Sequence, residues 1–131
     1  MTERDRSETM IFVIDDDDAV RDSLKILLES HSMTVREFGS AQEFLDAYEP
    51  HPRCCLILDL NLPVMGGLDF LSILEANAVD VPTIMVTGRG DDAIRDRALA
   101  KGAVAFLEKP VTERDLVTSI ARALELNRES A

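Results

Sequence analysis

The sequence contains no tryptophan, one tyrosine and two cysteines among its 131 residues. The two cysteines, Cys54 and Cys55, are neighbours. Because consecutive residues of a strand point to opposite faces, this pair cannot form an ordinary disulfide or a shared metal site. Long uncharged apolar runs are also missing, and the charged N-terminus lacks the pattern of a signal peptide. We therefore expect a cytoplasmic protein without a membrane span.

Basic residues are scarce. The chain has 14 lysines and arginines against 25 aspartates and glutamates, which gives a formal net charge of -11. A surface of this sign repels nucleic-acid backbones and anionic membranes. We therefore expect no direct binding to nucleic acid or to a membrane, and any DNA-directed output would have to come from another domain.

Short apolar runs alternate along the chain with segments whose apolar residues recur at helical spacing. The runs predict strands at 10–14, 34–38, 54–58, 81–86 and 103–107. The helical spacing predicts helices at 19–30, 40–48, 68–76 and 91–101, and a last helix around 116–124. Strict alternation with short connections implies a parallel sheet covered by helices on both faces. The expected fold class is single-domain α/β, with 1–9 as a flexible N-terminal segment and 10–127 as the domain.

Polar residues collect directly after the predicted strands, where an open parallel sheet binds its ligands. They are Asp15 to Asp18 after the first strand, Asp59 after the third, Thr87 and Gly88 after the fourth, and Lys109 and Pro110 after the fifth. Carboxylates forced together repel one another, and a hard dication with oxygen ligands relieves the repulsion. We expect a Mg²⁺ site formed by carboxylates of the Asp15–Asp18 run and of Asp59, and the backbone carbonyl of Asn61 is close enough in sequence to contribute.

The same arrangement predicts phosphoryl chemistry. Asp59 can attack a phosphorus atom because the metal and Lys109 offset the charge on the phosphoryl oxygens. The hydroxyl of Thr87 can then donate to a phosphoryl oxygen that exists only in the modified state, which moves the loop after the fourth strand. We expect a self-catalysed switch with slow autodephosphorylation rather than an enzyme.

Each of these residues has an ordinary explanation when taken alone. A run of aspartates is commonly a solvated loop, and we expect Asp17 and Asp18 to cap and charge the start of the first helix. Asp59, Thr87 and Lys109 would singly pass for strand-end or surface residues. Their joint position at the carboxyl ends of different strands favours the functional interpretation.

These segments resemble the response regulator receiver domains of two-component signalling. The resemblance rests on Val13-Ile14-Asp15-Asp16, Leu58-Asp59-Leu60-Asn61-Leu62-Pro63, Gly67, Val86-Thr87-Gly88 and Glu108-Lys109-Pro110. It covers nearly the whole chain and implies a flavodoxin-like, doubly wound (β/α)5 fold with strand order 2-1-3-4-5. The segments Phe38-Gly39-Ser40-Ala41 and Gly90-Asp91 are similar to those of FixJ-type receivers, which usually precede a helix-turn-helix domain.

The resemblance implies the role of each site residue. Asp59 becomes the phosphorylation site, Lys109 the phosphate-binding cation and Thr87 the switch hydroxyl. Asp15 and Asp16 become the metal-binding acidic pair, and Asn61 contributes its carbonyl. Phe106 occupies the position of a family aromatic whose rotamer follows the threonine, although an aromatic at a strand end fits core packing equally well. A cis peptide is implied before Pro110.

The resemblance also implies partners. A histidine kinase or phosphotransfer protein would donate the phosphoryl group, and an output domain or target protein outside this chain would receive the signal. The face made of the fourth helix, the fifth strand and the fifth helix is a possible homodimer surface.

Three alternatives compete with this interpretation. Haloacid-dehalogenase-like phosphohydrolases carry a second aspartate two residues after the nucleophile as general acid, where this chain has Asn61. A flavodoxin-like cofactor binder needs a loop rich in glycine or hydroxyls where four aspartates stand. A degenerate receiver that acts only as an interaction module would be expected to lack the lysine, the threonine or an acid, and none is missing.

Overall fold

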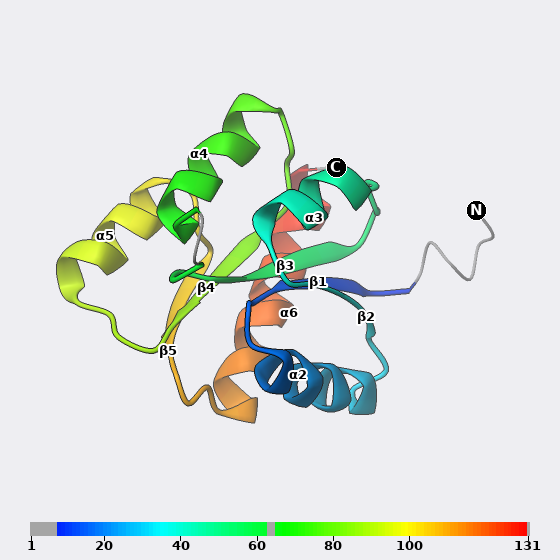
Figure 1. The fold of residues 1–131 in the computed structure, drawn as a ribbon. Coiled ribbons are helices and arrows are strands. Elements are labelled where there is room, and N and C mark those ends of the chain that lie inside the picture. The colour runs from blue at the N-terminus through cyan, green and yellow to red at the C-terminus, as the bar shows by residue number, and fades with distance from the viewer. Residues whose placement is uncertain (1–7, 63–64, 131) are drawn as a thin grey trace.

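The computed structural model describes residues 8–62 and 65–130, with the side chains of 127–130 left aside (Figure 1). Its elements are β1 (Met10–Ile14), α2 (Asp18–Ser30), β2 (Thr34–Phe38), α3 (Ala41–Ala47), β3 (Cys54–Asp59), α4 (Gly67–Ala76), β4 (Thr83–Thr87), α5 (Asp92–Ala100), β5 (Ala105–Glu108) and α6 (Glu113–Ser130). The strands pair in parallel in the order β2-β1-β3-β4-β5. The predicted fold class and strand order are therefore confirmed.

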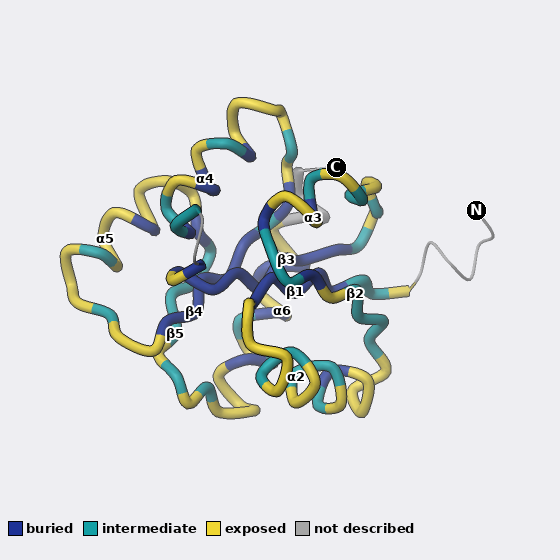
Figure 2. Tube along the Cα trace, in the orientation of Figure 1, coloured by how far each residue is buried: buried dark blue, intermediate teal, exposed yellow. Residues whose placement is uncertain are grey.

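Two apolar cores lie on opposite faces of the sheet. Helices α3, α4 and α5 cover one face, and α2 and α6 cover the other (Figure 1). The neighbours Cys54 and Cys55 are both buried, one in each core, as their positions in the sequence predicted. Figure 2 shows the result: the central strands β1, β3 and β4 are buried, the edge strands β2 and β5 are mostly half-buried, and the outer sides of the helices are exposed. No helix among the described residues is long and apolar enough to cross a membrane.

An aromatic cluster fills the core beneath α3. The ring of Phe44 lies 5.5 Å from that of Phe12 and 5.4 Å from that of Phe38, measured between centroids. Tyr48 and Phe70 complete the cluster, at 5.1 Å and 6.0 Å from the same ring. Most of these pairs meet edge to face, the geometry that aromatic quadrupoles favour. The cluster holds α3 against the sheet close to the end of β1, where the candidate site begins.

Capping side chains set the starts of three helices. Asp17 accepts hydrogen bonds from the backbone N–H groups of Ala19 and Val20, as predicted for this aspartate run. Ser40 and Asp91 cap α3 and α5 in the same way. Helices α3 and α5 therefore begin one residue later than predicted, because the first polar residue of each segment is the cap rather than part of the helix.

The strands near the site also differ slightly from the prediction. Strand β4 begins at Thr83 rather than at Val81, since Pro82 has no N–H to donate to a ladder. Strand β5 begins at Ala105 because the chain before it closes the end of α5: the N–H of Ala103 donates to the carbonyl of Ala98, 3.0 Å away. Residues 1–7 of the predicted flexible segment and Pro63 lie outside the described residues, and the bounds 10–127 remain a prediction.

Candidate functional site

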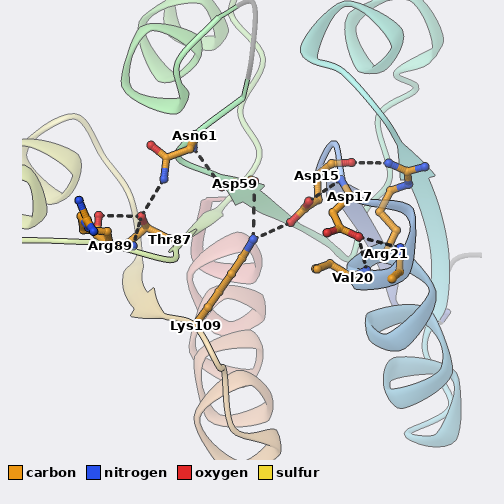
Figure 3. Close-up of polar contacts among 10 residues, drawn as sticks. Asp15, Asp17, Val20, Arg21, Asp59, Asn61, Thr87, Arg89 and Lys109 are labelled. Carbon is orange, nitrogen blue, oxygen red and sulfur yellow. Dashed lines mark hydrogen bonds and ion pairs between the residues drawn. The ribbon is translucent and has the colours of Figure 1, made fainter.

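The carboxyl ends of four strands bring the predicted site residues together (Figure 3). Asp15 directly follows β1, Asp59 is the last residue of β3, Thr87 is the last residue of β4, and Lys109 directly follows β5. Asp15 and Lys109 are 94 positions apart in the sequence and make a direct contact. The topology alone therefore assembles one polar cluster from four separate segments.

Three carboxylates form the centre of this cluster. One oxygen from each of Asp15, Asp16 and Asp59 lies within 4.8 Å of the other two. Asp15 and Asp59 are only 3% and 6% exposed, whereas Asp16 faces solvent. Anionic oxygens at this spacing fit a small hard cation, and Mg²⁺ prefers carboxylate oxygens together with water. The donor set of this cluster thus suits the metal that the sequence predicted.

Lys109 is the cation nearest to these carboxylates among the described residues. Its Nζ donates to Oδ2 of Asp15 at 3.1 Å and lies 3.6 Å from Oδ2 of Asp59. Burial by itself would lower the pKa of Lys109, but the hydrogen bond to Asp15 and the charge of Asp59 outweigh it and raise the pKa. The ammonium therefore stays charged at neutral pH and points into the cluster.

The surroundings of Asp59 disfavour the charged form of its carboxylate. Its pKa is raised, first because the group is buried and then because Asp15 and Asp16 repel its charge. The backbone N–H of Asn61 donates to Oδ1 at 3.0 Å and, together with Lys109, acts in the opposite direction. One lysine thus compensates only part of three negative charges, which a divalent cation would relieve.

Thr87 is buried beside this cluster and its hydroxyl is fully engaged. Its Oγ1 donates to the carbonyl of Arg89 at 3.0 Å and accepts from the N–H of the same residue at 3.1 Å. The side-chain amide of Asn61 also donates to this oxygen, at 3.2 Å. The sequence predicted a role for the backbone carbonyl of Asn61 but none for its side chain, although Asn61 stands only two residues after Asp59.

Phe106, the second predicted switch residue, lies on β5 opposite Met85 of β4 and is half-buried against the core under α4 and α5. The peptide bond between Lys109 and Pro110 is cis, as the resemblance implied.

A cavity of about 590 Å³ extends from the carboxylates along the inner side of α2, with apolar walls that include Val20, Leu24 and Leu116.

Comparison with known proteins identifies the family of this chain. The model of the response regulator receiver domain family matches residues 11–121. Nodulation protein W from Bradyrhizobium diazoefficiens is 37% identical over 123 residues, which cover 94% of this chain and 54% of that protein. The transcriptional regulatory protein FixJ from Azorhizobium caulinodans is 40% identical over 119 residues, covering 91% of this chain and 56% of that protein.

Solved structures give the same result. The response regulator StyR superposes with a TM-score of 0.87 at 36% identity, covering 94% of this chain and 62% of that one. The crystal structure of FixJ-N superposes with a TM-score of 0.82 at 32% identity, covering 90% and 94%. The chain spans about half the length of the curated relatives it matches. It belongs to the family of response regulator receiver domains, which act in two-component signal transduction.

Proposed function

We propose that Asp59 is the phosphoacceptor of this receiver domain and that Asp15, Asp16, Asp59 and the backbone carbonyl of Asn61 hold Mg²⁺. The observation that carries this proposal is the contact of a single lysine with two buried carboxylates. Lys109 lies between Asp15 and Asp59, in a cluster whose oxygens are close enough to share one cation. This arrangement places the Lys109 ammonium beside the carboxylate that would receive the phosphoryl group.

In the proposed transfer, an oxygen of the Asp59 carboxylate bonds to phosphorus while the bond from phosphorus to the donor atom breaks. The electron pair of the broken bond leaves with the donor, which is the imidazole of a phosphohistidine or the acetate of acetyl phosphate. The hydrogen bond from the Asn61 N–H to Oδ1 orients the carboxylate and leaves Oδ2 toward Lys109. A bound Mg²⁺ would supply positive charge that offsets the carboxylates and the phosphoryl oxygens.

Lys109 has two successive roles in this proposal. Before transfer its ammonium neutralises part of the charge shared by Asp15 and Asp59. After transfer it can donate to a phosphoryl oxygen, because its ammonium reaches the space between Asp15 and Asp59 (Figure 3). In this proposal the protein catalyses its own phosphorylation and then loses the phosphoryl group slowly by hydrolysis. It acts as a switch and not as an enzyme with repeated turnover.

We propose that Thr87 and Phe106 couple phosphorylation of Asp59 to a conformational change. The hydroxyl of Thr87 carries one hydrogen, which the Arg89 carbonyl accepts in the present structure. Donation to a phosphoryl oxygen requires that this bond break, so the loop between β4 and α5 must change and Phe106 can move with it. The surface formed by α5, β5 and α6 would carry the change to a second copy, an output domain or a target protein.

Partners follow from the same proposal. A histidine kinase or phosphotransfer protein would donate the phosphoryl group in the cytoplasm, and an output domain or target protein would receive the signal. The relatives include a transcriptional regulatory protein, FixJ. A transcriptional output for the protein that contains this chain is consistent with that likeness.

The intact mass of the protein after incubation with acetyl phosphate tests the central step. We expect a gain of one phosphoryl group that requires Mg²⁺ and disappears in Asp59→Asn. Asp46→Asn is the matched control, because Asp46 is an exposed carboxylate on α3 outside the cluster. Absence of the mass gain with the wild type under every condition would contradict the proposal and would favour an interaction module that works without phosphorylation.

A further inference from the structure

Arg21 lies unusually deep for a helix-surface arginine. It stands in the first turns of α2, yet its side chain is only 13% exposed and folds back toward the end of β1 (Figure 3). Its Nη1 donates to the backbone carbonyl of Asp15 at 2.5 Å, and its Nη2 pairs with Asp18. Its Nε lies 3.5 Å from the carboxylate of Glu37 on β2. One guanidinium therefore joins a helix, a loop and the neighbouring strand.

This arrangement differs from an ordinary ion pair along a helix. A pair with Asp18 alone would leave both side chains in solvent and would contribute little. Burying a guanidinium requires several acceptors, and its planar fork of donors can serve the Asp15 carbonyl and two carboxylates together. A purely structural role would be to pin α2 to β2, for which the contact with Glu37 would suffice. The contact with the Asp15 carbonyl remains unexplained by that role.

The Asp15 carbonyl is a sensitive point of the site. Asp15 is held from two sides: Arg21 binds its main chain, while the N–H of Asp17 and the ammonium of Lys109 bind its side-chain oxygens at 2.9 Å and 3.1 Å. Rotation of the peptide that follows Asp15 would change the direction of the next residue, Asp16, which is exposed to solvent. The fork of Arg21 opposes that rotation.

We propose that Arg21 is a positioning residue for the metal site, which fixes the main chain at Asp15 so that the carboxylates of Asp15 and Asp16 converge on Asp59. This inference rests on the function proposed above. Residues that orient metal ligands without binding the metal typically change metal affinity by about 10- to 100-fold when they are replaced. Arg21 stands in that relation to Asp15.

The sign of the effect separates positioning from simple electrostatics. Arg21→Gln removes a positive charge next to an acidic cluster, so charge alone would strengthen Mg²⁺ binding. If Arg21 positions the ligands, the same variant weakens binding instead. Arg21→Lys keeps the charge but loses the fork, and we expect it to weaken binding as well. Glu37→Gln is the matched control, because it removes one partner of Arg21 and leaves the contact with Asp15.

The experiment measures the Mg²⁺ dissociation constant of the whole chain by titration calorimetry, with urea unfolding to establish that each variant is folded. We expect Arg21→Gln to raise the constant about 10-fold or more and Glu37→Gln to leave it within about twofold. In the metal-free proteins, hydrogen exchange of the Asp17 amide should be faster in Arg21→Gln and unchanged in Glu37→Gln. Unchanged or tighter Mg²⁺ binding by Arg21→Gln, or wild-type affinity in Arg21→Lys, would overturn the inference. Failure of the wild type to bind Mg²⁺ would instead overturn the proposed function.

Discussion

Gly90 lies against the ring of Phe106, and the contact leaves no room for a methyl group. A Cβ at position 90 would stand 2.7 Å from Cε1 of Phe106 and 3.0 Å from Cγ2 of Thr87. The two predicted switch residues therefore meet at one glycine in the loop between β4 and α5. The constraint is steric, since the contact rather than the backbone conformation requires a residue without a side chain.

We expect Gly90→Ala to push the ring of Phe106 out of its present position. Overpacking of this kind typically costs about 1–3 kcal/mol, and the ring can relieve it by changing its rotamer. The variant should therefore shift the NMR signals of the Phe106 ring and of the loop before any phosphoryl group is added. Chemical shifts measured in the unphosphorylated protein check this.

Gly88→Ala is the matched control for this prediction. It stands in the same loop, and a Cβ at position 88 would meet nothing within 4 Å. We expect its Phe106 signals to stay at their wild-type positions. Equal shifts in both variants would mean that any alanine disturbs the loop, and the specific coupling of Gly90 to Phe106 would be refuted.

Asp59→Asn should stabilise the metal-free protein at neutral pH. Burial and the neighbouring acids raise the pKa of Asp59 above its usual value of 3.8. Between the usual pKa of the unfolded chain and the raised pKa of the folded state, the folded protein holds a proton that the unfolded chain releases. Stability therefore rises as the pH falls through that window and is lost as the pH rises through the folded pKa. Asparagine removes the buried charge, and Lys109 keeps Asp15 as its partner.

The expected gain is about 1 kcal/mol in the free energy of unfolding, the usual scale of a single substitution. Urea unfolding in the presence of a chelator at pH 7.5 measures it, and the advantage should shrink as the pH approaches 4. Asp96→Asn, which changes an exposed carboxylate on α5, should leave stability within about 0.5 kcal/mol of the wild type. A less stable Asp59→Asn at neutral pH would show that the ion pair with Lys109 outweighs burial.

Ala78, at the end of α4, adopts a left-handed backbone conformation. It follows the C-cap of α4 with a φ of 55°, and the N–H groups of Ala78 and Val79 bond back to the helix. A left-handed conformation costs an L-residue roughly 1–2 kcal/mol, while glycine loses about 0.5–1 kcal/mol more entropy on folding. We therefore expect Ala78→Gly to raise the free energy of unfolding by about 0.5–1 kcal/mol.

Two further substitutions test whether that gain comes from the left-handed conformation. Ala121→Gly, at an exposed position inside α6, should lose roughly 1 kcal/mol because glycine weakens a helix interior. Gly102→Ala should also lose stability, since Gly102 closes α5 with a φ of 104°. Urea midpoints of the three variants provide the comparison. A loss of stability in Ala78→Gly would contradict the strain at this position.

The sequence predicted the fold and the cluster for the same physical reason. In a parallel sheet the carboxyl end of every strand reaches the same edge, so strand identity alone placed Asp15, Asp59, Thr87 and Lys109 together. The short side chains of Asp15, Asp59 and Thr87 stay close to their strand ends, and the long side chain of Lys109 reaches them from the end of β5. The strand order came instead from the family resemblance, because alternation of strands and helices is compatible with more than one order.

The remaining contacts depend on side-chain rotamers, which the spacing of residues in the sequence does not predict. Arg21 could have pointed to solvent like most of the other polar residues of α2, and its contacts with Glu37 and the Asp15 carbonyl turn it inward. The contact of Gly90 with Phe106 joins a loop and a strand through one rotamer. Element bounds shifted where caps and Pro82 replaced regular hydrogen bonds, a local effect that periodicity does not register.

Removal of the Thr87 hydroxyl should separate phosphorylation of Asp59 from the conformational change that follows it. Thr87→Val keeps the methyl group beside Gly90 but removes the hydrogen bonds with Arg89 and Asn61. Because Asp59 and Lys109 are untouched, we expect the variant to accept a phosphoryl group from acetyl phosphate. In the resting state it should lose about 0.5–1.5 kcal/mol of stability for each hydrogen bond that water does not replace.

What Thr87→Val should lose is the response to the modification. In the wild type, phosphorylation should shift the amide signals of α5, β5 and α6, since the hydroxyl must release the Arg89 carbonyl to reach the phosphoryl group. Valine has no hydroxyl and cannot donate a hydrogen bond to the phosphoryl group, so those shifts should shrink by at least half. Intact mass should still report the modification. Thr87→Ser restores the hydroxyl and should restore the shifts. Full shifts in Thr87→Val would mean that the new charge at Asp59 moves this surface by another route, and the threonine would then be a packing residue that happens to face the site.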